Sequence, residues 1–484
     1  MSSQIATSVG TPVKRPQRKM TPARAWTITL LLAIFLFINY SDKALVGLAG
    51  THIQDDLGLT AQQFGLVQSS FYWLFAAGAL LLGALSSKIK LRWYLAALML
   101  VWVGTMIPLM GVIGFSALMA CRIILGFAAG PAYALANHSV QLLFPAEKRA
   151  LASGVVTAGS SLGPLVMAPV LTWIIVQWSW HTAFGVLAVG GIIWALAWII
   201  FGGSATDGEA VDDSADDAVS ASATAALSTK AAARAAKKAA RKAAIVAEEP
   251  AHVPYRVLLG TSTVIGIALL NFFSYWSTSL KVAWLPVYLA DGLGYDTITV
   301  GRLVALPFAT AAVFSIVAGY VSSWLYKRGF SRRVSRGYLA GGLVAAAGLS
   351  MWGFTVVPPG WFQLTLVALA FSLNTASIGV GFTALGDIIN PKKRGGIMGG
   401  IVALSSLAGI MSPLVLGFTV GGAGASPADG YDAGFAVIGL MIAIGAVIAT
   451  IFIRPDRDLV KINDWAAVHG DLSQKNDTEK AGDR

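Results

Sequence analysis

The stretch AWTITLLLAIFLFINYSDKALVG, residues 25–47, contains no charged side chain until positions 42 and 43. An α-helix needs about 20 apolar residues to cross the roughly 30 Å hydrocarbon core of a bilayer, and this stretch supplies them. It is too long for the apolar core of a secretory signal peptide, and the residues before it are polar through Lys19. The stretch therefore predicts a transmembrane helix.

Eleven further apolar stretches of comparable length follow along the chain. Of its 484 residues, 56% are hydrophobic and 12% are charged, whereas an ordinary soluble domain has about 25% charged residues. In water such a chain would expose large adhesive patches, which indicates that lipid surrounds it. The sequence predicts an all-α membrane protein with twelve transmembrane helices, near residues 25–47, 62–85, 93–114, 117–141, 150–176, 182–202, 257–289, 298–325, 337–357, 361–387, 396–420 and 433–453.

One long interruption, residues 203–256, divides the twelve stretches into two sets of six. The sets share short patterns, because Arg149 precedes Ser160-Ser161-Leu162 by the same offset with which Arg394 precedes Ser405-Ser406-Leu407. Two pseudo-symmetric six-helix bundles with a site between them at mid-membrane suit alternating access. We expect an N-terminal tail (1–24), a first bundle (25–202), a central loop (203–256), a second bundle (257–453) and a C-terminal tail (454–484).

Lysine and arginine are concentrated in alternate loops. Basic clusters lie before the first expected helix and after the second, fourth, eighth and tenth, whereas loops such as 48–61 and 421–432 are short and acidic. Basic loops stay on the cytoplasmic side of a cell membrane. The pattern predicts a protein integral to the plasma or inner membrane, with both termini and the central loop in the cytoplasm.

Composition also argues against other classes of protein. The single cysteine, Cys121, excludes a disulfide framework and a multi-cysteine metal site, and the five scattered histidines show no ligand spacing. The net charge of +11 comes from loop clusters and not from one basic module, so we expect no nucleic acid partner. No catalytic triad or phosphate-binding loop is found. We expect no cofactor, no metal, no enzymatic activity and no catalytic residue, and a monomer surrounded by membrane lipids.

The first helix carries two charged residues, Asp42 and Lys43, a few residues below its expected outer end. A charge at the bilayer centre costs about 2.5–3.5 kcal/mol on the insertion scale, so each one needs a reason. Arg122 lies at a comparable depth in the fourth helix. We hypothesise that Asp42 pairs with Lys43 or Arg122, and that protonation of Asp42 releases a cation to bind an anionic substrate. In the alternative interpretation, Asp42 and Lys43 reach the interface and anchor the helix.

Further candidate residues lie in other helices. Lys281, in the seventh helix, lies near Pro286 and a run of serine and threonine, which favours a bent helix that lines water. It is a second candidate to bind the anion, unless it extends to the headgroups instead. Tyr72 and Asn374 are candidate hydrogen-bond partners of the substrate, or they satisfy neighbouring groups structurally. His138 is a candidate proton relay because imidazole titrates near neutral pH, or it is a satisfied polar residue near a helix end.

Two loops, after the second and the eighth helix, have similar sequences. The candidate gating residues in them are Gly83, Ser87, Arg92, Gly319 and Ser323. The first loop resembles the glycine-initiated basic loop of the major facilitator superfamily, and residues 122–130, RIILGFAAG, resemble the RxxxG motif of its fourth helix. Where that family usually has an aspartate that latches the cytoplasmic side, this chain has Ser87 and Ser323. The resemblance implies the twelve-helix fold of that superfamily, with a latch formed by other groups.

Shorter patterns resemble the anion:cation symporters of the superfamily, which import organic anions with protons. They are Tyr40-Ser-Asp42-Lys43, Phe71-Tyr72-Trp73, Trp284-Leu-Pro-Val-Tyr-Leu289 and Leu385-Gly-Asp387-Ile-Ile-Asn-Pro391. The resemblance implies proton coupling at Asp42, carboxylate binding at Lys43 and Arg122, and substrate contact at Tyr72. Many members also have a glutamate in the fourth helix where this chain has Ala-Ala-Gly, residues 128–130, so Asp42 or His138 would carry the proton.

The combined expectation is a secondary active transporter that imports a small organic anion, a carboxylate, by proton symport through alternating access. Two alternatives stay open. Residues 159–164, GSSLGP, match the first part of an antiporter pattern, GxxxGPxxGG, although Met167-Ala168 replaces its last glycines. This half-match is the argument for proton-coupled efflux of a drug or metabolite. The other alternative is a non-transporting membrane receptor.

Overall fold

The computed structural model describes residues 21–85, 89–144, 146–202, 253–422 and 427–482. Within these ranges, twelve helical segments are long and apolar enough to cross a membrane. Each of them overlaps one of the twelve stretches expected from the sequence, so the all-α membrane fold is confirmed. Residues 203–252, which make up most of the expected central loop, lie outside the described residues.

The helices form two groups along the chain. Before residue 203 they are α1 (Pro22–Leu48), α2 (Gly50–Leu57), α3 (Ala61–Trp73), α4 (Phe75–Leu85), α5 (Leu91–Met106), the 3-10 turn η1 (Pro108–Met110), α6 (Phe115–Ala129), α7 (Ala132–Leu143), α8 (Ala146–Gln177) and α9 (Trp180–Phe201). From residue 253 they are α12 (Tyr255–Leu259), α13 (Ser262–Ala283), α14 (Leu285–Val287), the π-helix η2 (Tyr288–Gly292), α15 (Thr297–Lys327), the π-helix η3 (Arg333–Tyr338), α16 (Leu339–Val356), α17 (Trp361–Ile388), α18 (Pro391–Gly422), α19 (Pro427–Phe452) and α20 (Pro455–Gly482).

Helices break where the sequence cannot continue a regular hydrogen-bond ladder. Pro131 separates α6 from α7, and α13 ends at Ala283 shortly before Pro286, which lies in the next short helix. Proline lacks a backbone donor and crowds the preceding turn, so both breaks are expected. The second break lies just after the membrane-spanning segment Ser262–Ala283, which carries Lys281.

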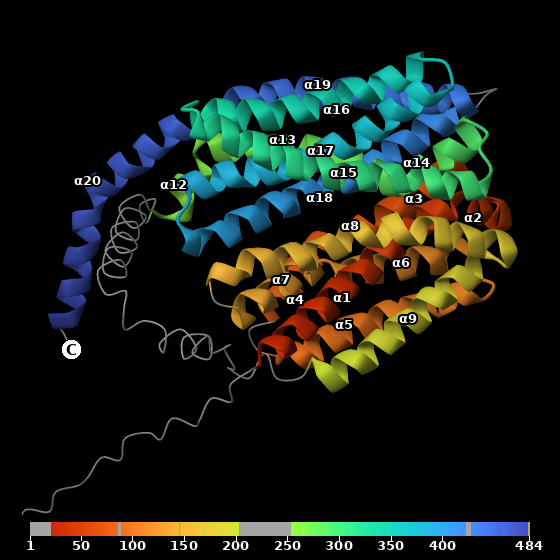
Figure 1. The fold of residues 1–484 in the computed structure, drawn as a ribbon, viewed down its shortest axis with the longest axis horizontal. Helices are drawn as coiled ribbons and strands as arrows, with labels where there is room; N and C mark the ends of the chain where they lie inside the picture. The colour runs from red at the N-terminus through yellow and green to blue at the C-terminus, as the bar shows by residue number, and fades with distance from the viewer. Residues whose placement is uncertain (1–20, 86–88, 145, 203–252, 423–426, 483–484) are drawn as a thin grey trace, which may run out of the picture.

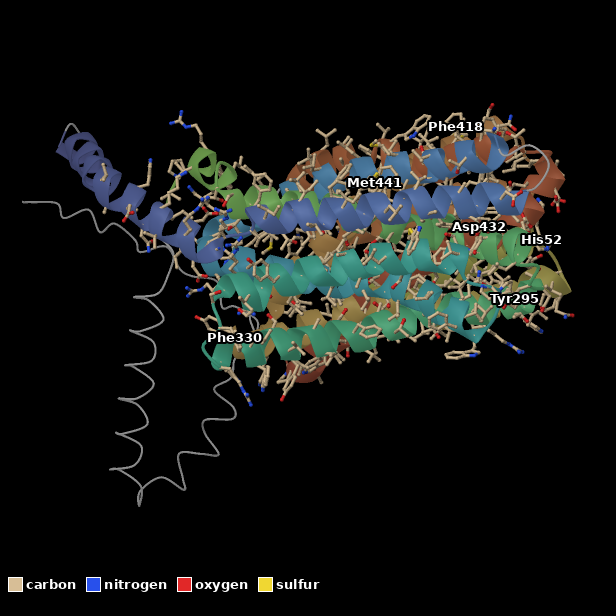
Figure 2. The ribbon with its side chains drawn as sticks, turned by 90° about the horizontal axis from the view of Figure 1, so that it is seen from above. His52, Tyr295, Phe330, Phe418, Asp432 and Met441 are labelled. Carbon is tan, nitrogen blue, oxygen red and sulfur yellow. The ribbon has the colours of Figure 1, made fainter. Side chains whose placement is uncertain are left out.

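The two groups of helices pack as two bundles that run side by side (Figure 1). The start of α1 and the whole of α20 lie at one end of the molecule, here called the terminal end. Residues His52, Tyr295 and Asp432, which come from both bundles, lie at the opposite or distal end, and Phe330 lies at the terminal end (Figure 2). Any site formed by both bundles therefore lies along the junction between these two ends.

Glycines allow the bundles to meet at backbone distance toward the distal end. A Cβ atom on Gly47 of α1 would overlap the carbonyl oxygen of Val282 in α13, and one on Gly65 of α3 would lie 2.7 Å from the carbonyl oxygen of Pro413 in α18. The side-chain amide of Gln68 also donates to the carbonyl of Ala283 (3.1 Å). These contacts form a tight distal seam between the bundles.

The segment expected as a C-terminal tail forms the helix α20, which docks on the second bundle. Asp458, fully buried, accepts hydrogen bonds from the hydroxyl of Ser262 (2.9 Å) and the backbone N–H of Thr263 (2.6 Å). The first N–H groups of a helix have no partner within the helix, and a carboxylate there also complements the helix dipole. Asp458 therefore fixes the start of α20 to the start of α13.

A carboxyl group at the distal end is sensitive to pH. Partial burial, together with the nearby carboxylate of Asp55 in the first bundle, raises the pKa of Asp291 in η2 from 3.8 to about 6. Because the folded protein holds this proton more tightly than the unfolded chain, the contribution of Asp291 to stability is greatest below about pH 4 and is lost as pH rises through about 6.

Asp291→Asn removes the charge and should gain thermal stability relative to the native protein as pH rises from 4 to 7. The gain should be a few degrees at most, because the side chain stays partly exposed to solvent. Melting curves in detergent over this pH range measure it, and Asp55→Asn should reproduce part of the change. Parallel pH profiles for the native protein and Asp291→Asn would contradict the assignment.

Candidate functional site

Asp42 and Arg122 are buried together inside the first bundle. Their exposed fractions are 1% and 3%, and the carboxylate of Asp42 interacts electrostatically with Arg122 and with Lys43. The side chain of Asp42 therefore points into the protein and not toward lipid, which favours the pairing hypothesis over the alternative in which Asp42 and Lys43 anchor the end of the first helix.

Lys43 and Arg122 share the ring of Phe71, which α3 places between α1 and α6. The ammonium of Lys43 lies 5.1 Å from the centre of this ring and 4.4 Å from that of Tyr40, and the guanidinium of Arg122 lies 5.1 Å from the Phe71 centre. Aromatic faces attract cations without neutralising them. The ring thus holds two positive charges near one another while their charge stays available to an anion.

Several polar atoms of this cluster have no hydrogen-bond partner among the described residues. They are both carboxylate oxygens of Asp42, and Nε and Nη1 of Arg122. Buried polar groups are nearly always hydrogen-bonded, and leaving one unpaired costs about 1–3 kcal/mol, more for a charged group. The cluster therefore has the character of a binding site for a polar ligand and not of a self-satisfied structural network.

Asn39 belongs to this environment although sequence reasoning did not single it out. It lies one turn before Asp42 on α1 and is 2% exposed, and neither atom of its amide group has a partner among the described residues. Residues three apart on a helix are neighbours on its surface. The spacing of three residues from Asp42 is the sequence feature from which Asn39 could have been predicted as part of the site.

Tyr72 lies at the junction of the two bundles. Its ring packs edge-on against Tyr275 of α13, with centroids 5.8 Å apart, and a Cβ atom on Gly409 of α18 would lie 2.7 Å from it. The side chain is half-buried. The structure thus places this expected substrate contact between the first-bundle cluster and the second bundle.

Lys281 is buried within the second bundle, with an exposed fraction of 4%. Its ammonium group donates to the carbonyl of Phe371 (3.1 Å) and the hydroxyl of Thr375 (3.4 Å), both on α17. It does not extend to the headgroups, so that alternative is wrong. The structure also does not bring it into contact with Asp42 or Arg122, and the four charges do not form the single cluster expected from the sequence.

Asn374 forms hydrogen bonds inside the second bundle. Its amide nitrogen donates to the carbonyl of Ser274 (3.2 Å) and the hydroxyl of Thr278 (2.8 Å) on α13, while its amide oxygen has no partner among the described residues. The donor side of the amide therefore fixes α17 to α13. The free oxygen is the part that can still meet a ligand.

The expected gating residues are placed as follows. Arg92 donates to the carbonyl of Ile199 in α9, within the first bundle. Gly319 has open space around it, and the exposed Ser323 donates to the carbonyl of Gly319 one turn earlier in α15 (2.9 Å). Ser87 and the side chain of His138 lie outside the described residues, as do the surroundings of Gly83.

A cluster that sequence reasoning missed lies at the terminal end of the second bundle. Arg336 in η3 forms an ion pair with Asp387 of α17 (3.2 Å) and donates to the hydroxyl of Ser322 in α15 (2.8 Å). Ser322 in turn donates to the carbonyl of Ser335 (2.8 Å). The basic run 332–336 and Asp387 were the signals, but nothing in the sequence pairs them. The cluster ties three elements of this bundle together.

Comparisons with known proteins agree with this architecture. The probable galactarate/D-glucarate transporter of Bacillus subtilis is 24% identical over 92% of this chain and 96% of its own length. The D-galactonate transporter of Escherichia coli is 28% identical, over 88% and 96%. In fold, the chain is similar to a bacterial homologue of the human lysosomal transporter Spinster, with a TM-score of 0.70 at 15% identity, over 92% and 99% of the two chains.

The model of the Major Facilitator Superfamily matches residues 32–383 and 267–475, which is most of the chain. Its members are membrane transporters and not enzymes, and the sugar acid transporters named above are relatives of this protein. The chain belongs to the Major Facilitator Superfamily.

Proposed function

We propose that the protein imports a small organic anion with a carboxylate group by proton symport, through alternating access. The observation that carries the proposal is the buried cluster of Asp42, Lys43 and Arg122, in which the carboxylate and the guanidinium keep unpaired polar atoms. Relatives named for sugar acids support a carboxylate as the substrate.

Binding of the proton and binding of the anion are coupled because both act on the pair of Asp42 and Arg122. The proton neutralises the carboxylate of Asp42, and the anion takes its place as the partner of Arg122. Arg122 offers a planar pair of donors that suits a carboxylate, and Lys43 adds a second positive charge. While Asp42 is ionised, it attracts Arg122 and repels the substrate. A proton on Asp42 removes both effects, so binding of either ligand favours binding of the other. Tyr72 is the neutral substrate contact at the junction of the bundles.

The basic loops orient the protein. The clusters at residues 88–92, 327–333 and 392–394 follow helices that end at the terminal end, and positive loops stay in the cytoplasm. We infer that the terminal end is cytoplasmic in the plasma or inner membrane. The distal seam then closes the outer side of the transporter.

Asp42→Asn is expected to abolish uptake driven by a proton gradient while exchange of substrate across the membrane continues. Asparagine keeps the size of the side chain but carries neither the charge nor the transferable proton. Uptake of labelled D-glucarate and D-galactonate into proteoliposomes, with and without a pH gradient, measures the effect. Asp429→Asn, an exposed aspartate at the distal end, serves as the control. Undiminished gradient-driven accumulation by Asp42→Asn would refute the coupling role.

The efflux alternative rests on the glycines of α8, and packing alone explains them. A Cβ atom on Gly159 would overlap the carbonyl oxygen of Ala33 in α1, and one on Gly163 that of Phe37. Small residues at such contacts let two membrane helices approach closely. Inside-out vesicles separate the two directions of transport, because an exporter would concentrate its substrate there in exchange for protons.

A further inference from the structure

Lys281 is a buried cation whose described neighbours carry no negative charge. Its ammonium group donates to Phe371 and Thr375 and lies 4.7 Å from the centre of the Phe308 ring. These groups satisfy its hydrogen bonds but do not neutralise its charge. The ion pairs among the described residues all lie at the terminal end, and none involves Lys281. Its counter-charge must therefore come from elsewhere.

Lys281 lies at a depth in the molecule similar to that of Lys43, but it belongs to the other bundle. The next residue of α13, Val282, meets Gly47 of α1, and Gly47 is about one helical turn from Lys43. About two turns before Val282 in α13, Tyr275 meets Tyr72 of the first bundle. The two contacts place the part of α13 that carries Lys281 against the part of the first bundle that carries Lys43 and Tyr72, although the described contacts of the Lys281 ammonium group lie in α15 and α17.

The charges at this depth do not balance. Lys43, Arg122 and Lys281 are positive, and Asp42 is the one acidic side chain that faces them among the described residues. The proposed coupling requires a protonated Asp42 when the substrate binds, and three positive charges then remain in a region where uncompensated charge is expensive. A substrate with one carboxylate neutralises one of them, and a dianion neutralises two.

We propose that the substrate is a dianion, with one acidic group bound by Arg122 and Lys43 and a second bound by Lys281. The inference rests on the proposed function and narrows it from carboxylates in general to compounds with two acidic ends. The tyrosines at positions 72 and 275 meet across the junction of the bundles, and their hydroxyl groups suit a hydroxylated chain that joins the acidic groups. In the alternating-access cycle, such a substrate would bridge both bundles and leave one of the three positive charges uncompensated, whereas a monoanion would leave two.

The test compares two six-carbon sugar acids that differ in the number of carboxylates. D-glucarate has one at each end and D-gluconate has one only, and each is measured as a competitor of labelled D-glucarate uptake into proteoliposomes. The native protein should prefer the diacid by about 30-fold, because loss of one partner of a buried charge pair costs 2 kcal/mol or more.

Lys281→Met should reduce this preference to within about threefold, whereas Lys281→Arg, which keeps the charge, should retain most of it. If the native protein does not distinguish the two acids, or if Lys281→Met weakens both equally, the dianion inference is overturned while carboxylate transport stands. If neither acid is taken up or competes, the proposed function itself fails and the inference fails with it.

Discussion

Gly47→Val is expected to reduce transport by more than about 100-fold in a protein that still folds. The added side chain would occupy the space of the Val282 carbonyl, and a backbone atom in α13 cannot move away as the end of a side chain can. Overpacking of this kind costs 1–3 kcal/mol or more, and each 1.36 kcal/mol is a factor of ten in a population. The bundles meet at Gly47 only when the distal seam is closed, so the variant is held with its distal end open.

The control is Gly104→Val, in α5, where a Cβ atom would meet open space. Both variants should express and elute as intact protein, and only Gly47→Val should lose uptake. A cysteine at position 68, on the distal seam, reports the conformation directly in a background that carries Cys121→Ser. An impermeant maleimide added from the distal side should label it faster in Gly47→Val. Normal uptake by Gly47→Val would show that closure of the seam is not required.

Arg122→Met should abolish binding and transport of carboxylates, with a loss of at least about 100-fold in the apparent affinity. The change removes the donors Nε and Nη1 that have no partner in the described structure, and leaves the buried Asp42 with Lys43 as its remaining cation. Competition for labelled D-glucarate uptake measures the affinity, and Arg122→Lys should restore only part of it because an ammonium lacks the planar pair of donors.

Arg302→Met is the matched control for the loss of an arginine in a membrane-spanning helix. Arg302 is an exposed side chain near the start of α15. It is not one of the cations that contact the ring of Phe71, which are Lys43 and Arg122. It should transport at close to the native rate. Equal affinities for the native protein and Arg122→Met would remove Arg122 from the site and end the proposal for the N-terminal cluster.

The fold was predictable because membrane-spanning helices satisfy their own backbone and must be long and apolar. All twelve segments overlap their predictions, and their ends differ from the predicted ones by six residues at most. The docking of α20 was not, since Asp458 is one of many acidic residues in a polar segment. Its burial depends on the start of α13, almost 200 residues away along the chain.

The candidate site was predictable in part. A charged residue is easily recognised in an otherwise apolar stretch of sequence. For this reason all four candidates could be found from the sequence alone, namely Asp42, Lys43, Arg122 and Lys281. Their depth follows from distance along the helix, and the structure does bring Asp42 and Arg122 together. The direction in which each side chain points does not follow from the sequence, because it depends on the rotation and tilt of each helix against its neighbours. For that reason the contact of Lys281 with α17 was not foreseen, and the roles of all four residues stay predictions.

The attachment of α20 has a practical consequence for following the transport cycle. Asp458 couples this helix to the start of α13, the same helix that holds Lys281 and Tyr275 near the junction of the bundles. A fluorophore on an exposed residue near the start of α20, where the helix is attached, therefore reports the orientation of the second bundle. Paired with a dye near the start of α1, it would convert each rocking motion into a change in energy transfer without any alteration of the membrane-embedded residues.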